Sequence, residues 1–204
     1  DRQNLSEITV DYFNRMIRAA SRMQNLIDAL ISYSRTNAAS HDAQVTDLNT
    51  LLQEVKDDLQ ESIDEKKATL TWDTLPVLRL IPLQIYQLFI NLISNALKYR
   101  KKDVPPQIHI SYKLLTASQI HEVGLQENKY HSISIQDNGI GFEERYKTKI
   151  FELFQRLHGK TEYDGTGIGL AICKKIMRNH DGIITASGEP GIGSVFTIYL
   201  PANE

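Results

Sequence analysis

Apolar residues recur every three or four positions near the start of the chain, which predicts a helix over residues 5–36. Neighbouring apolar residues widen this stripe to the face that a bundle helix buries. Its members are Phe13, Met16, Ala20, Met23, Ile27 and Leu30, widened by Ile17, Leu26 and Ile31. One helix cannot bury such a stripe alone, so we expect partner helices from upstream sequence, from a second copy or from both. Packing against the rest of this chain is the alternative.

Residues 34–40 form a Ser-, Asn- and Ala-rich run that is typical of a linker. After it, helical and strand-like periodicities alternate along the chain. Asp47 is a suitable N-cap for the next helix, and Pro82 suits the first turn of a later, strongly apolar one. The periodicities predict helices over 48–66, 82–99, 143–153 (one or two short ones) and 168–180, and strands over 68–72, 108–115, 130–136, 183–186 and 194–200. A polar excursion, 116–128, joins two of these strands. Strands mostly in consecutive hairpins predict an α+β fold instead of a dinucleotide-binding βαβ sheet.

Composition narrows the functional classes. The chain has 204 residues, 41% of them hydrophobic, and a net charge of −2, which indicates a soluble globular protein without a general nucleic-acid surface. Cys173 is the only cysteine, so no internal disulfide can form. No apolar run reaches the ~20 residues of a membrane span. We therefore expect a cytoplasmic part of a longer protein, without nucleic-acid partners or direct membrane contact.

Two asparagines stand out on the apolar helix over 82–99. Asn91 and Asn95 are four residues apart and share one face, with Lys98 and Tyr99 one turn later. An amide oxygen can bind Mg²⁺, a lysine can meet phosphate, and a tyrosine can line a base or ribose. A single buried amide would more simply bond to neighbouring backbone, but this combination favours a polar wall that faces a site.

Asp137 ends a predicted strand and opens a glycine cluster, D-N-G-I-G (137–141). A carboxylate only accepts hydrogen bonds, so it suits the exocyclic amine of adenine and would repel the carbonyl of guanine. The same letters are also common turn chemistry, which is the simpler interpretation of Asp137 alone.

A second glycine cluster, Gly165, Gly167 and Gly169, precedes the last predicted helix. The N–H groups and dipole of a helix N-terminus favour phosphate there. The cations just upstream either add charge for a triphosphate or belong to a solvated loop; these residues are Arg156, His158 and Lys160.

Taken in order, these motifs resemble the catalytic and ATP-binding domain of bacterial sensor histidine kinases. N-L-I-S-N-A-L-K-Y (91–99) is similar to the asparagine box of that family, and D-N-G-I-G (137–141) to its first glycine box. I-F-E-L-F-Q-R-L (150–157) resembles its phenylalanine box, and G-T-G-I-G-L-A (165–171) its second glycine box. The closing strand, 191–201, matches too. The helix over 15–35 is similar to the second helix of the dimerisation and histidine-phosphotransfer domain, especially in phytochrome-like kinases.

The resemblance implies an α+β fold of the Bergerat type, a two-layer α/β sandwich with a mixed sheet, over residues 45–204. A dimerisation helix (1–36) and a linker (37–44) would precede it. ATP and Mg²⁺ would bind under a mobile lid over 155–166. The implied partners are a second copy, joined through a helical bundle, and the receiver domain of a response regulator.

Carried over position by position, the resemblance implies that Asn95 binds Mg²⁺ and that Asn91 lines the same site. Lys98 would meet phosphate, Tyr99 the nucleotide and Asp137 the adenine. The other implied nucleotide-site residues are Gly139, Gly141, Arg156, Lys160, Gly165, Thr166, Gly167, Gly169 and Leu170. Phe151 and Phe154 would anchor the base of the lid or simply pack in the core.

Asn91 also helps to distinguish ATP hydrolysis from phosphate transfer to a protein. The related ATPases carry a glutamate one turn before the metal-binding asparagine, and that glutamate activates water. An amide cannot act as a general base, so we expect poor hydrolysis and transfer to a protein acceptor instead. The family's acceptor histidine lies on the first dimerisation helix, whereas His41 here lies in the linker without the surrounding motif. We expect the acceptor upstream of Asp1. The alternative is a non-catalytic ATP-binding or response-regulator-docking module.

Overall fold

The computed structural model describes residues 9–17, 19–20, 23–24, 27, 43–115, 129–157 and 166–202. Every described residue up to Ile27 is helical, as predicted, and the apolar stripe is exposed there, with Phe13 at 47% and Met23 at 59%. The predicted linker over 34–40 and the excursion over 116–128 lie outside the described residues.

In the part of the chain that the structure describes, no helix combines the length and the apolar character that crossing a membrane requires.

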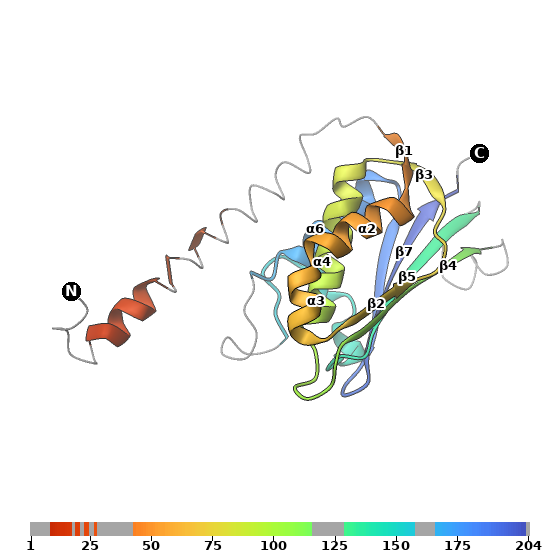
Figure 1. Cartoon of the computed structure of the whole chain (residues 1–204). Coiled ribbons are helices and arrows are strands. Elements are labelled where there is room, and N and C mark those ends of the chain that lie inside the picture. The colour runs from red at the N-terminus through yellow and green to blue at the C-terminus, as the bar shows by residue number, and fades with distance from the viewer. Residues whose placement is uncertain are drawn as a thin grey trace.

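A five-stranded mixed sheet forms one layer (Figure 1). Its order is β2 (Thr69–Trp72), β4 (Gln107–Leu115), β5 (Tyr130–Asp137), β7 (Gly193–Pro201) and β6 (Ile183–Glu189). β2 pairs with β4 in parallel, and all other pairs are antiparallel. The mixed sheet is confirmed, but β5 and β7 are neighbours without being consecutive, so the strands are less hairpin-like than expected.

Helices form the second layer, against one face of the sheet (Figure 1). They are α2 (Leu48–Asp58), α3 (Gln60–Lys66), α4 (Pro82–Lys98) and α6 (Gly169–Asn179), with the short 3₁₀ turns η2 (Glu144–Tyr146) and η3 (Lys149–Phe151). The predicted apolar face of α4 is confirmed as buried, from Ile85 to Leu97. It packs on the alternate strand residues that face it, among them Ile110, Ile133 and Ile198.

Two local features differ from the sequence-based expectation. The helix predicted over 48–66 is two helices, because Leu59 leaves helical geometry with φ −95° and ψ 3°. A small antiparallel ribbon, β1 (Gln44–Asp47) with β3 (Val77–Leu80), was not predicted. Each of its strands buries only one residue, so neither shows a clear alternation of apolar and polar positions.

The first glycine cluster joins the two layers at one end of the molecule. The N–H of Ile140 donates to the carbonyl of Tyr99 at 2.9 Å, and the N–H of Gly191 donates to the carbonyl of Ile140 at 2.7 Å. At Gly141, where φ is +65°, a Cβ would lie 2.0 Å from the Glu189 carbonyl oxygen. Only glycine therefore allows the turn between β6 and β7 to close on the end of α4.

We predict that Gly141→Ala destabilises the protein far more than Gly191→Ala does. Both residues have a left-handed backbone, which costs a non-glycine residue about 1 kcal/mol. A Cβ at Gly191 meets nothing within 4 Å, whereas one at Gly141 collides with backbone. We expect about 1 kcal/mol for Gly191→Ala and more than about 4 kcal/mol for Gly141→Ala, measured by urea unfolding. Equal losses would contradict the close packing at Gly141.

Candidate functional site

A cavity of about 80 Å³ lies between α4, the first glycine cluster and the start of α6. Six of the predicted site residues line it: Asn95, Tyr99, Asp137, Gly141, Arg156 and Leu170. They come from segments far apart in the sequence, so the fold brings together what the motifs only suggested.

The C-terminal half of α4 supplies the polar wall of this cavity. Asn95 and Tyr99 are one helical turn apart and both line the cavity. The ammonium group of Lys98 donates to the Tyr99 hydroxyl at 3.1 Å and lies 4.5 Å from the centre of its ring. Lys98 therefore reaches the site through Tyr99, as a cation at the edge of the cavity.

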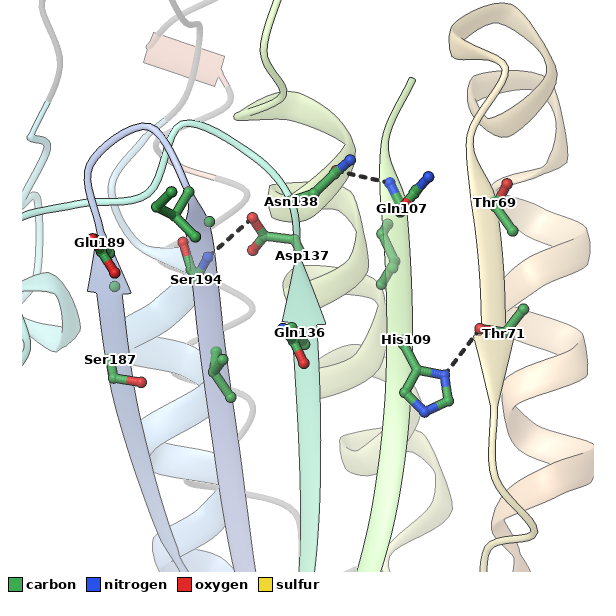
Figure 2. A pocket seen from close by; sticks show the side chains of 15 residues that line it. Thr69, Thr71, Gln107, His109, Gln136, Asp137, Asn138, Ser187, Glu189 and Ser194 are labelled. Carbon is green, nitrogen blue, oxygen red and sulfur yellow. Dashed lines mark hydrogen bonds between the residues drawn. The ribbon is translucent and has the colours of Figure 1, made fainter. Parts of the chain in front are cut away.

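Asp137 is held in place by two backbone N–H groups. Its Oδ1 accepts from Gly139 at 2.8 Å and from Ser194 at 3.2 Å; Figure 2 shows the bond with Ser194. Burial raises the pKa of this carboxyl, against the opposing effect of these donors and of Lys101. Both backbone N–H groups bond to Oδ1, and the Ser194 side chain also interacts with this carboxylate, so Oδ2 is the oxygen that we expect to face a ligand.

Asn91 lies one turn before Asn95 but is not among the residues that line the cavity. Its amide nitrogen donates to the carbonyl of Gly169 at 3.4 Å, and its amide oxygen accepts from Gln87 at 3.2 Å. Asn91 thus braces α4 against the first residue of α6, an arrangement that the sequence did not indicate.

The second glycine cluster is described from Thr166 onward, so Lys160, Gly165 and His158 lie outside the described residues. Gly167 has φ +72°, and its carbonyl accepts from the N–H of Phe154 at 2.9 Å. Phe154 is itself left-handed, at φ 64°. This bond fastens the two ends of the segment predicted to be a lid.

The two phenylalanines of this region differ in burial. Phe151 is buried and packs edge-on against Phe196, so core packing describes it well. Phe154 is 55% exposed, so its side chain is not part of the core. Thr166 accepts from the N–H of Ile168 at 3.4 Å through its hydroxyl, close to the start of α6.

Sequence reasoning missed the residues that complete the cavity. They are Ala96, Phe142, Ile150, Gln155, Leu157, Ser194 and Phe196. Most are apolar, and the sequence gives no sign that separates an apolar cavity floor from ordinary core. Ser194 had a usable signal, because it follows a glycine at the start of the closing strand.

A larger hollow of about 770 Å³ lies on the face of the sheet opposite the helices (Figure 2). Polar strand residues such as Thr71, His109, Gln136 and Ser187 point into it. Its described lining includes the carboxylates of Asp137 and Glu189 but neither lysine nor arginine. It therefore offers no lysine or arginine charge to balance the negative charge of a triphosphate. The smaller cavity is therefore the better candidate for a nucleotide.

We predict that Asp137→Asn is at least as stable as the wild type without nucleotide. The folded-state pKa of Asp137 lies above the unfolded one, so its contribution to stability falls as pH rises through these values. At pH 7 the buried carboxylate is therefore a net cost, and asparagine retains an acceptor for Gly139 and Ser194. Asp137→Ala loses both bonds and should be about 1 kcal/mol less stable in urea unfolding. Equal destabilisation by both variants would contradict this account.

Comparison with known proteins places the chain in a family. A family model described as "Histidine kinase-, DNA gyrase B-, and HSP90-like ATPase" matches residues 81–204. The chain is 37% identical over 191 residues to Cyanobacterial phytochrome A of Nostoc sp., covering 94% of this chain and 23% of that protein. It is 33% identical over 197 residues to Phytochrome-like protein Cph1 of Synechocystis sp., covering 97% of this chain and 25% of that protein. The chain thus spans about a quarter of the length of these relatives.

Solved structures show the same fold. ShkA full-length in complex with AMPPNP matches with a TM-score of 0.70 at 20% identity, over 98% of this chain and 40% of that one. The nucleotide-free catalytic domain of histidine kinase ThkA matches with a TM-score of 0.61 at 24% identity, over 78% of this chain and 95% of that one. These matches confirm the predicted Bergerat-type sandwich. Because the family model covers more than half of the chain, the chain belongs to the histidine kinase-, DNA gyrase B- and HSP90-like ATPases, and its phytochrome relatives support a sensor histidine kinase ATPase domain.

Proposed function

We propose that this chain binds Mg·ATP and transfers its γ-phosphate to a histidine outside the chain, from which a response-regulator aspartate receives it. The observation that carries the proposal is the meeting of Asn95, Tyr99 and Asp137 in one cavity of a fold shared with ATPases. The chemistry of these three residues and the family of the chain support a nucleotide site here.

The adenine end of the cavity combines one acceptor with an apolar floor. Oδ2 of Asp137 accepts from the exocyclic amine of adenine, while the carbonyl of guanine would face the same carboxylate. The rings of Phe142 and Phe196 lie 6.4 Å apart and contribute to the floor on which a planar base can pack.

The phosphate end has suitable donors and a metal ligand. Asn95 offers an amide oxygen, and Mg²⁺ prefers oxygen ligands while keeping waters and phosphate oxygens in its shell. No group of three or more His, Cys, Asp or Glu that could hold a metal exists among the described residues. A single amide oxygen from Asn95 fits a Mg²⁺ ion whose other ligands are mainly water and the phosphates of the nucleotide. The ion would partly neutralise the charge of those phosphates. Lys98, Arg156 and the start of α6 supply the remaining positive potential.

The arrangement favours transfer to a protein over hydrolysis. Asn91 occupies the place of the water-activating glutamate in related ATPases, and its amide is engaged by Gln87 and Gly169. Of the histidines in the described part of the chain, His109, His131 and His180, none lines the cavity. None of these three described histidines is therefore placed to accept the phosphate.

The exposed stripe on the N-terminal helix supports assembly with a second copy. Met16, Ile17 and Met23 are each more than half exposed, and a solvated stripe of this width gains free energy when partner helices cover it. We propose a cytoplasmic homodimer joined through a helical bundle, with the receiver domain of a response regulator as the downstream partner.

We predict that Asn95→Ala weakens Mg·ATP binding about tenfold or more, as expected when one hydrogen-bonding or metal-binding oxygen of a charged site is lost. Isothermal titration calorimetry measures the effect. Gln136→Ala is the matched control, because Gln136 neighbours Asp137 but faces the opposite side of the sheet, and its affinity should not change. A wild-type chain that fails to bind Mg·ATP would refute the proposal.

Phosphotransfer needs the longer protein that carries the upstream helix. There we predict acid-labile phosphate from γ-labelled ATP on a histidine of that helix, and none with Asn95→Ala. ATP binding without any labelled histidine would instead favour the regulatory, non-catalytic module.

A further inference from the structure

Polar contacts cross the interface between α4 and α6 from one end to the other. Because the two helices run antiparallel, the start of α6 meets the later part of α4, and its end meets the beginning of α4. We call this set of contacts the α4–α6 seam. At its first two contacts, Asn91 donates to the Gly169 carbonyl (3.4 Å) and Cys173 Sγ donates to the Leu88 carbonyl (3.9 Å). At the last two, Asn179 Nδ2 donates to Gln84 Oε1 (3.1 Å) and the N–H of Ile81 donates to His180 Nε2 (3.0 Å).

His180 closes the seam at the end far from the nucleotide cavity. Its Nε2 accepts from the N–H of Ile81, the N-cap residue of α4, and its Nδ1 lies 2.8 Å from the carbonyl of Ile176. A carbonyl can only accept, so the proton is on Nδ1 and the ring is neutral. The same ring therefore holds the N-cap residue of one helix and the last turn of the other.

A second proton on this ring would break the contact with α4. It would place an N–H on Nε2, facing the N–H of Ile81. Burial lowers the pKa of His180, while the Ile176 carbonyl and Asp181 oppose that shift. The α4 residues at this end, Pro82 to Ile85, are uncharged, and Arg79 of β3 is on the exposed side of its strand. Among the described residues, Asp181 is thus the one charged group that acts on His180.

We propose that His180 is a positioning residue for the nucleotide site: its neutral ring keeps the α4–α6 seam closed, and its protonation weakens nucleotide binding. This rests on the function proposed above.

The coupling follows from how α6 is held. Its middle is buried, with Ile172, Cys173 and Ile176 in the core, so the helix is supported between its two ends. Over its 11 residues the helix moves as a unit, and release of its C-terminal end shifts its start. That start carries Gly169, which Asn91 holds, and Leu170, which lines the cavity.

Thermodynamic linkage makes the coupling reciprocal. A nucleotide that binds the closed seam better must favour the neutral ring, so bound Mg·ATP lowers the pKa of His180 further. A merely structural histidine would not respond to the nucleotide in this way.

The test compares Mg·ATP dissociation constants at pH 7.5 and pH 5.5 for the wild type, His180→Gln and His131→Gln. Glutamine can accept from Ile81 and does not titrate. The pKa of His131 is also lowered by burial, but its ring bonds to Tyr112 on the sheet, so it is the matched control. We expect wild type and His131→Gln to lose about fivefold more affinity on acidification than His180→Gln. Titration of ATP itself cancels in this comparison, and equal losses in all three proteins would overturn the proposal.

Wild-type measurements keep the proposal testable if His180→Gln fails to fold. The His180 ring, followed by NMR, should titrate at lower pH with Mg·ATP than without it, and an unchanged titration would overturn the coupling. If none of the three proteins binds Mg·ATP at either pH, the proposed function fails. The pH dependence of the α4–α6 seam is then tested in the protein without nucleotide. Hydrogen-exchange protection of Ile172 and Cys173 should then fall at pH 5.5; unchanged protection would refute the seam as well.

Discussion

The site depends on one close approach of backbone to backbone, where the turn between β6 and β7 closes on the first glycine cluster. A Cβ on Gly141 would lie 2.0 Å from the Glu189 carbonyl oxygen, and one on Gly193 would lie 2.0 Å from that of Asp137. This approach brings the Ser194 N–H to the Asp137 carboxylate and ties Ile140 to the end of α4. Without it, Asn95, Tyr99 and Asp137 would not face the same cavity.

The glycines of this cluster therefore act in a way that differs from the simplest interpretation of a glycine-rich motif. Glycine-rich motifs commonly allow backbone to approach a phosphate closely, yet Gly139 and Gly141 are already crowded by protein backbone, at Tyr99 and Glu189. They position the carboxylate that we assign to adenine. Gly167 similarly meets Phe154 and Gln155, where the two ends of the proposed lid come together. Glycine is required first by the architecture, and the ligand chemistry follows from it.

The sequence predicted what depends on local pattern or on ordered motifs. The buried face of α4 followed from periodicity, and the fold from the asparagine and glycine motifs. The β1–β3 ribbon could not be predicted, because each four-residue strand buries a single side chain. The bond between Asn91 and Gly169 joins positions 78 residues apart, and no local pattern encodes it. The apolar cavity floor, such as Phe142, was indistinguishable from core by composition alone.

We place the nucleotide in the small cavity under α4 and not in the larger hollow on the open face of the sheet. Backbone amide NMR with Mg·AMPPNP distinguishes the two positions. We expect the largest chemical-shift changes at Asn95, Gly141 and Leu170, with little change at Thr71, His109 and Ser187. Changes centred on the open face, with α4 and α6 unaffected, would contradict this placement.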